Sequence, residues 1–216
     1  YQDDNKLKTG RVWRYFKGLA EPSPKKVGND MIPTLEWAQP GFNDSKWSRG
    51  TVSIGYGDND DKTILGDMRN RYTSIYLRHA FSIGEPYEMD NLMLHVEYDD
   101  GFIAYLNGQE IGRSSTMNFT GSPPPFDTEA NAGHEVTAKP ATINLKDHFQ
   151  LFKPSPAQNI LAIQVHNTTR SSSDLSIHPS LIERKTLAGS IENGDPNGEW
   201  TFRFIPEQHH IGTKTL

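Results

Sequence analysis

The stretch HVEYDDGFIAYLNGQEIGR, residues 95–113, indicates the fold class more directly than any other part of the chain. If it is extended back to residue 92, its first half places four apolar side chains on one face, Leu92, Leu94, Val96 and Tyr98. Met93, His95 and Glu97 occupy the alternate positions. A period of two residues is typical of an antiparallel strand with one face in the core. The stretch therefore predicts β-structure.

Two turn signals divide this stretch. Asn107-Gly108 is a strong hairpin signal, because a type I′ turn needs positive φ at both central residues. Asp99-Asp100-Gly101 supplies a glycine for a second reversal, and we expect both aspartates to bond nearby backbone N–H groups there. On this interpretation the corner only turns the chain, and residues 92–113 form a three-stranded meander.

The remaining sequence also favours an all-β fold, since long apolar stripes at helical spacing are absent. Further strands are expected over residues 11–19, 52–57, 72–83 and 159–167. Residues 58–71 and 114–140 are expected to be long irregular loops, and 147–152 at most a short helical turn. Trp37 and Trp47 are expected in the core.

The length of 216 residues suits one domain. We expect its sandwich core to span about residues 11–183. Residues 184–216 would form a C-terminal extension, in which 198–205 alternate like an added edge strand.

Composition excludes several classes of function. The formal charge of −5 gives no attraction to nucleic acid, and no apolar stretch is long enough for membrane insertion. The first ten residues also lack the apolar segment of a signal peptide. With no cysteine, disulfide and thiolate chemistry are absent.

Six pieces of the chain, in order, resemble a known family: FNDSKW, SIGYGD, YLRHAFSI, EYDDGFIAYLNGQEIGR, NILAIQVHN and SSSDLSIHPSL. They are similar to the galactose-binding-like jelly-roll domain of large secreted bacterial proteins. A looser likeness links YLNG and NILAIQVHN to the sugar-binding domain of β-galactosidase-type glycoside hydrolases. The resemblance implies an antiparallel β-sandwich that serves as a noncatalytic module, secreted or at the cell surface, beside neighbouring domains of a larger protein.

Carbohydrate recognition needs aromatic faces for the sugar ring and planar polar groups for its hydroxyls. The loop at 58–71, with its flanks, carries both kinds of group: Tyr56, Asp58, Arg69, Arg71 and Tyr72. A second candidate segment, 127–135, ends in His134 and Glu135. These seven residues are the predicted polysaccharide-binding site. The alternative for the loop is a solvated surface with weak ion pairs.

The same loop contains a candidate metal site. Asp58, Asp60 and Asp61 offer the hard oxygen ligands that calcium prefers, although the spacing departs from that of an EF-hand. A structural Ca²⁺ is therefore an expectation, and no other cofactor is required.

Catalysis is the least supported function. The histidines form no HExxH motif, and neither a phosphate-binding glycine loop nor a GxSxG elbow is present. Three functions stay open: a carbohydrate-binding module, an adhesion or interdomain scaffold without sugar binding, and a polysaccharide-active enzyme domain.

Overall fold

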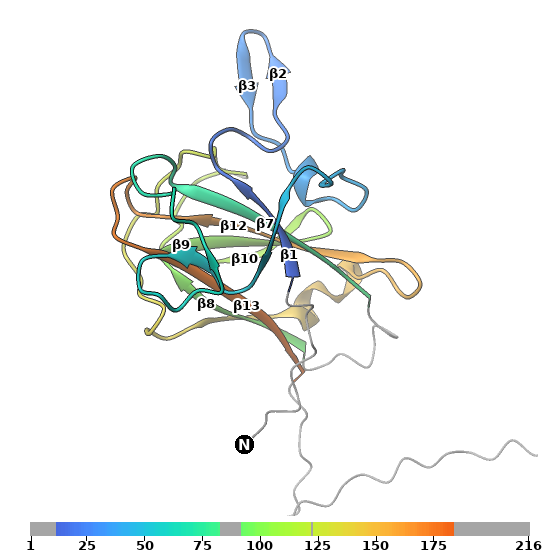
Figure 1. Ribbon diagram of the computed structural model, residues 1–216. Coiled ribbons are helices and arrows are strands. Elements are labelled where there is room, and N and C mark those ends of the chain that lie inside the picture. The colour runs from blue at the N-terminus through green and yellow to red at the C-terminus, as the bar shows by residue number, and fades with distance from the viewer. Residues whose placement is uncertain (1–11, 83–91, 122, 184–216) are drawn as a thin grey trace, which may run out of the picture. The chain divides into compact units, whose positions relative to one another are not determined.

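The computed structural model describes residues 12–82, 92–121 and 123–183, which all belong to one compact unit, Tyr1–Arg184. The fold is the expected all-β sandwich of two sheets (Figure 1). One sheet has six strands in the order β10 (Gln109–Arg113), β9 (Gly101–Leu106), β12 (Asn159–His166), β7 (Ser74–Phe81), β1 (Val12–Lys17) and β4 (Ser48–Thr51). The other has five, in the order β11 (Ala141–Asn144), β8 (Leu92–Asp99), β13 (Leu175–Glu183), β5 (Ile54–Tyr56) and β6 (Thr63–Ile64).

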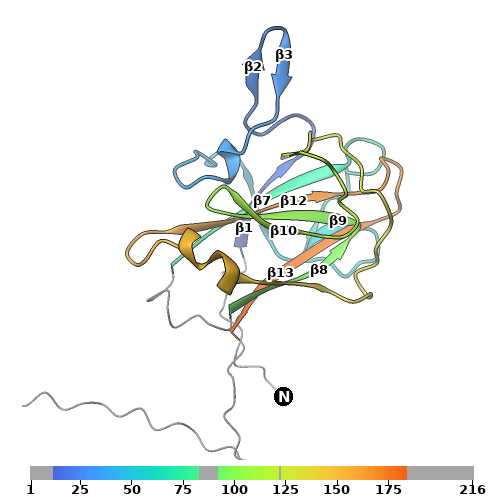
Figure 2. The same cartoon turned by 180° about the vertical axis from the view of Figure 1, so that it is seen from behind.

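A hairpin of β2 (Lys25–Val27) and β3 (Asp30–Ile32) projects from the sandwich, as Figures 1 and 2 show from opposite sides. The helical turns are η1 (Glu36–Ala38) and η3 (Leu145–Leu151), in agreement with the expectation of short turns. Neither is long and apolar enough to span a membrane, nor is any other helix in the described segments. The edge strand expected at 198–205 lies outside the described residues.

The core has two parts. Between the sheets, the inward faces contribute a cluster that includes Leu77, Leu94 and Ile163. A second cluster, around Trp37 and Trp47, covers the outer face of the six-stranded sheet. Because both faces of that sheet are covered, every residue of β12 is buried, which accounts for its nearly continuous apolar sequence.

The predicted three-stranded meander is wrong. The Asn107-Gly108 hairpin is present, with φ of 50° and 85°, and joins β9 to β10. β8, however, pairs with β11 and β13 in the opposite sheet. Asp99-Asp100-Gly101 therefore carries the chain from one sheet to the other. Alternation reveals that a strand has one buried face, but it does not reveal to which sheet the strand belongs.

Strand register brings several chain connections to one end of the sandwich. Leu175 pairs with Tyr56 where β13 begins and β5 ends, and the next residue, Ser176, pairs with Asp99 at the end of β8. In the other sheet His166 pairs with Gly101. The loops that follow β5 and β12 and the corner after β8 consequently lie close together.

Candidate functional site

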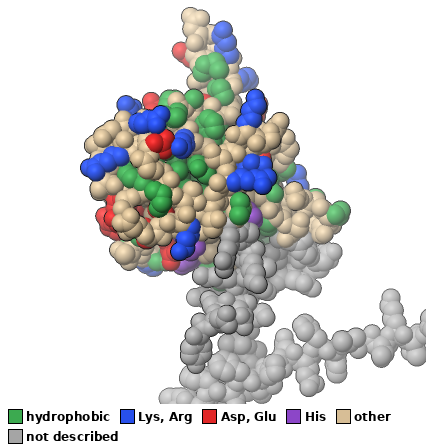
Figure 3. Space-filling view, viewed as in Figure 1, with side chains coloured by type: hydrophobic (Ala, Val, Ile, Leu, Met, Phe, Trp, Pro, Cys, Tyr) green, Lys and Arg blue, Asp and Glu red, His purple; other side chains and the backbone are tan. Residues whose placement is uncertain are grey.

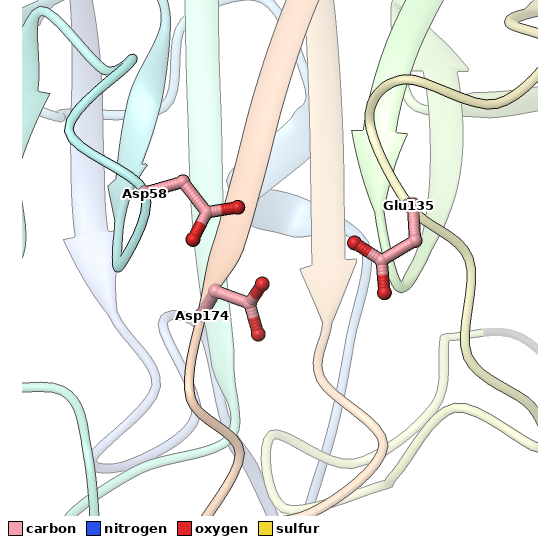
Figure 4. Close-up of side chains that lie close together, drawn as sticks. All are labelled: Asp58, Glu135 and Asp174. Carbon is pink, nitrogen blue, oxygen red and sulfur yellow. The ribbon is translucent and has the colours of Figure 1, made fainter.

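Three carboxylates from separate parts of the chain meet at this end of the sandwich. Asp58 follows β5, Asp174 precedes β13, and Glu135 lies in the long segment between β10 and β11 (Figure 4). One oxygen from each lies within 4.8 Å of the others. Figure 4 shows the three carboxylates directed toward a common space. We call these three residues, with the adjacent Asp99 and Asp100, the acidic rim.

Asp58 is brought to the rim by a tight turn. Gly57 has φ of 119°, and a Cβ atom at this position would lie 2.4 Å from Cβ of Asp174. Asn59 also has positive φ, at 63°. A glycine is needed here because a side chain would strain the backbone and collide with Asp174. The SIGYGD sequence thus permits the close approach of the two aspartates.

Glu135 is positioned by its neighbour His134. The His134 ring stacks on Tyr98, with 3.9 Å between ring centroids and 8° between planes. Its Nδ1 lies 2.8 Å from the carbonyl oxygen of Tyr98, and its Nε2 lies 3.2 Å from that of Lys139. Its backbone N–H donates to Asp100 over 3.1 Å. His134 therefore anchors the segment, and its polar atoms are engaged within the protein.

The backbone of Asp174 is fixed by a hydrogen bond from Asn167, whose side chain is buried, with the residue only 1% exposed. Nδ2 of Asn167 donates to the carbonyl oxygen of Asp174 over 2.7 Å and to the Tyr56 hydroxyl over 3.2 Å. Oδ1 of Asn167 is buried without a hydrogen-bond partner among the described residues. Ser173 donates its hydroxyl to the Asp174 carboxylate over 2.7 Å.

The corner aspartates do more than turn the chain. Asp100 accepts hydrogen bonds from Thr168, through its backbone N–H and its hydroxyl at 2.8 Å each, as well as from His134. Asp99 is 5% exposed, and burial, reinforced by Asp100 and Asp174, raises its pKa to about 9. The expectation of local turn bonding is corrected here. The sequence carries no signal for these distant partners.

The predicted tyrosines do not offer stacking faces. Tyr56 is 7% exposed and donates its hydroxyl to the carbonyl oxygen of Ser172 over 2.8 Å. Tyr72 is 3% exposed, and its hydroxyl donates to Asp67 over 3.1 Å. Both rings pack in the core: Tyr56 is the last residue of β5, and Tyr72 lies two residues before β7.

The two predicted arginines have different surroundings. Arg71 pairs with Asp67 at 3.0 Å, as part of a surface network that includes Lys17 on β1. Arg69 is exposed. Burial raises the pKa of Tyr56, and the charges that act on its hydroxyl include Arg69 as well as Asp174 and Asp99 of the rim. Of the two arginines, Arg69 is therefore the one whose charge acts at this end of the sandwich, and Arg71 is engaged by Asp67.

The structure regroups the predicted metal ligands. Asp58 lies with Glu135 and Asp174, and Asp60 and Asp61 are not in this group. Asp61 instead turns toward β13, where it accepts a hydrogen bond of 2.9 Å from Ser176. Burial raises the pKa of Asp61 to about 6.

A groove of about 580 Å³ is present on the outer face of the five-stranded sheet. It is lined by Met93, His95, Lys139, Pro140, Thr142 and Ile182. Sequence reasoning did not identify it, because its lining comes from β8, β13 and the start of β11 with the two residues before it, which are distant in the chain. It contains no aromatic side chain other than His95, so it offers less to a sugar ring than a stacking platform would.

Comparison with known proteins yields remote structural likenesses only. No family model and no curated protein sequence matches the chain. A β-glucuronidase of Bacteroides uniformis matches over 81% of this chain and 17% of its own, at 12% identity and a TM-score of 0.44. That of Bifidobacterium dentium, complexed with coumarin-3-O-glucuronide, matches over 72% and 19%, at 17% identity and a TM-score of 0.40. That of Ruminococcus gnavus, complexed with D-glucuronic acid, matches over 72% and 20%, at 13% identity and a TM-score of 0.41. The chain thus spans about a fifth or less of these proteins.

Proposed function

We propose that this chain is a noncatalytic carbohydrate-binding module of an extracellular protein, and that it binds polysaccharide at the acidic rim. One observation carries the proposal. The two segments chosen separately for sugar-binding chemistry meet at one end of the sandwich, where Asp58 and Glu135 lie together with Asp174. Loops clustered at the end of a rigid sandwich are a common place for recognition.

The rim offers polar rather than stacking recognition. Exposed carboxylates can accept hydrogen bonds from neighbouring sugar hydroxyls, and the guanidinium of Arg69 can donate to them. Since both candidate tyrosines are buried, affinity would come mainly from these polar groups. Such binding is expected to be weak for one sugar unit and to increase with the number of units on a polymer.

Affinity electrophoresis through gels containing different polysaccharides tests the proposal. The wild-type chain should be retarded by at least one polymer, and Arg69→Ala should lose this retardation. Arg49→Ala is the matched control, because Arg49 is an exposed arginine on the edge strand β4. Thermal unfolding should be unchanged in both variants, since exposed arginines contribute little to stability.

Two results would contradict the proposal. Retardation of Arg69→Ala equal to that of wild type would remove Arg69 from the site. If Lys139→Ala abolished retardation instead, the sugar would bind in the groove beside β11 and not at the rim.

A second function, an adhesion or interdomain scaffold, is favoured by the projecting hairpin. All six strand residues of β2 and β3 are exposed, including Val27, Met31 and Ile32. Figure 3 shows apolar and basic side chains together on this projection. A scaffold would show no retardation by any polysaccharide. In sedimentation velocity it would self-associate through the hairpin, and Met31→Ser would reduce that association.

A further inference from the structure

Three carboxylates of the acidic rim, those of Asp58, Glu135 and Asp174, have the spacing of ligands that share one metal ion. Their oxygens lie within 4.8 Å of one another. Calcium binds oxygen at about 2.3–2.6 Å, so two ligands on opposite sides of the ion are separated by up to about 5 Å. Magnesium binds at about 2.0–2.1 Å and demands nearly ideal octahedral geometry, so it requires a tighter arrangement. Separations within 4.8 Å fit the calcium geometry, and exposed carboxylates are the hard oxygen ligands that calcium takes.

No lysine, arginine or histidine of the described residues forms an ion pair with Asp58, Glu135 or Asp174. The carboxylates are nevertheless held close together, by the turn at Gly57 and by the stacked ring of His134. Mutual repulsion would separate three mobile carboxylates. Their convergence is therefore imposed by the fold.

A second, independent feature is a buried amide oxygen next to Asp174 that has no partner in the described segments. Nδ2 of Asn167 donates to the backbone carbonyl oxygen of Asp174 over 2.7 Å, so this side-chain amide lies beside the residue that carries the third carboxylate. The Oδ1 atom of the same amide is buried without a partner among the described residues. Buried polar atoms are nearly always hydrogen-bonded or coordinated. An amide oxygen is also one of the neutral ligands that calcium accepts.

We propose that the acidic rim binds one Ca²⁺ through Asp58, Glu135 and Asp174, with Oδ1 of Asn167 satisfied by the ion or by a water molecule on it. The ion would link the loop after β5, the segment before β11 and the loop before β13. Asp58 and Glu135 are exposed, so the remaining coordination positions are open to solvent. The proposal does not depend on sugar binding.

Isothermal titration with CaCl₂, on chelator-treated protein without polysaccharide, tests the site. We expect one ion per chain and a higher thermal unfolding temperature in calcium than in chelator. Glu135→Gln and Asp174→Asn should each weaken binding by at least about tenfold. Asp60→Asn is the matched control, because it also removes one negative charge, from an exposed residue of the loop that carries Asp58. It should bind calcium like wild type.

Several outcomes would overturn the proposal. These are the absence of binding at millimolar calcium, an equal loss of affinity in Asp60→Asn and Glu135→Gln, or equally tight binding of MgCl₂. Misfolding does not confuse the test, since in chelator Glu135→Gln should unfold at the wild-type temperature or above it. Failure of this titration leaves the polysaccharide proposal intact, and absence of polysaccharide retardation leaves the calcium proposal intact.

Discussion

His166 should make the stability of the fold fall steeply in mild acid. It ends β12, directly before Asn167, and is completely buried. Its Nδ1 lies 2.7 Å from the carbonyl oxygen of Thr128 and therefore carries the proton, while Nε2 is buried and has no hydrogen-bond partner in the described part of the chain. Burial lowers the pKa of His166 to about 4. The folded chain thus keeps a neutral ring where the unfolded chain would accept a proton.

The sign and size of the effect follow from this difference. An unfolded histidine has a pKa of about 6.5, so between about pH 6.5 and 4 the unfolded state binds one proton more than the folded state. The stabilisation that comes from keeping His166 neutral in the folded state is fully present above about pH 6.5, and it is lost as the pH falls toward about 4. Over this range the free energy of unfolding falls by up to about 1.4 kcal/mol for each pH unit of acidification, and by about 3 kcal/mol in total.

Urea unfolding across this pH range, with wild type and His166→Asn, measures the effect. Asparagine can still donate to Thr128 but does not titrate. The variant should be less stable near neutrality because packing is lost, and its deficit should shrink by about 3 kcal/mol on acidification to about pH 4. Taking the difference cancels other titrating groups, such as Asp61. Parallel curves for the two proteins would refute the reasoning.

Three further outcomes are expected. In calcium-free buffer, Asp99→Asn should gain stability relative to wild type as the pH rises from about 4 to 9, by up to about 1.4 kcal/mol per pH unit. The reason is that the Asp99 carboxyl ionises in the unfolded chain, whereas in the folded chain, with a pKa of about 9, it stays protonated. Urea denaturation of both proteins at about pH 5 and pH 8 checks this, and an equal stability difference at the two pH values contradicts it. Tyr72→Ala should lower the free energy of unfolding by about 3–5 kcal/mol, because a buried ring is lost; a stable variant without sugar retention would instead support a surface role. Gly57→Ala should cost about 1–3 kcal/mol through its strained φ and its collision with Asp174, and should weaken calcium binding in the same titration; unaltered stability and affinity would show that the turn does not set the spacing.

Local patterns predicted much of the architecture. The strand at 159–167 and the turn at Asn107-Gly108 could be recognised because alternation and turn chemistry act over a few residues. The burial of Trp37 and Trp47 followed from residue type. The selection of Asp58 and Glu135 was likewise chemical, since each lies in a polar, irregular segment between strands.

The sequence by itself determined that this chain folds as an all-β sandwich and where several of its strands and turns lie, because backbone periodicity and turn preference are short-range properties. It did not reveal β6, which lies within the segment 58–71 that was expected to be an irregular loop. Only the tertiary structure decided that β8 leaves the sheet of β9, that the two tyrosines turn inward, and that Asp58 meets Glu135 and Asp174. Those outcomes depend on which strands pair and which faces close on each other. Pairing is settled by contacts between residues far apart in the chain, which no local pattern encodes.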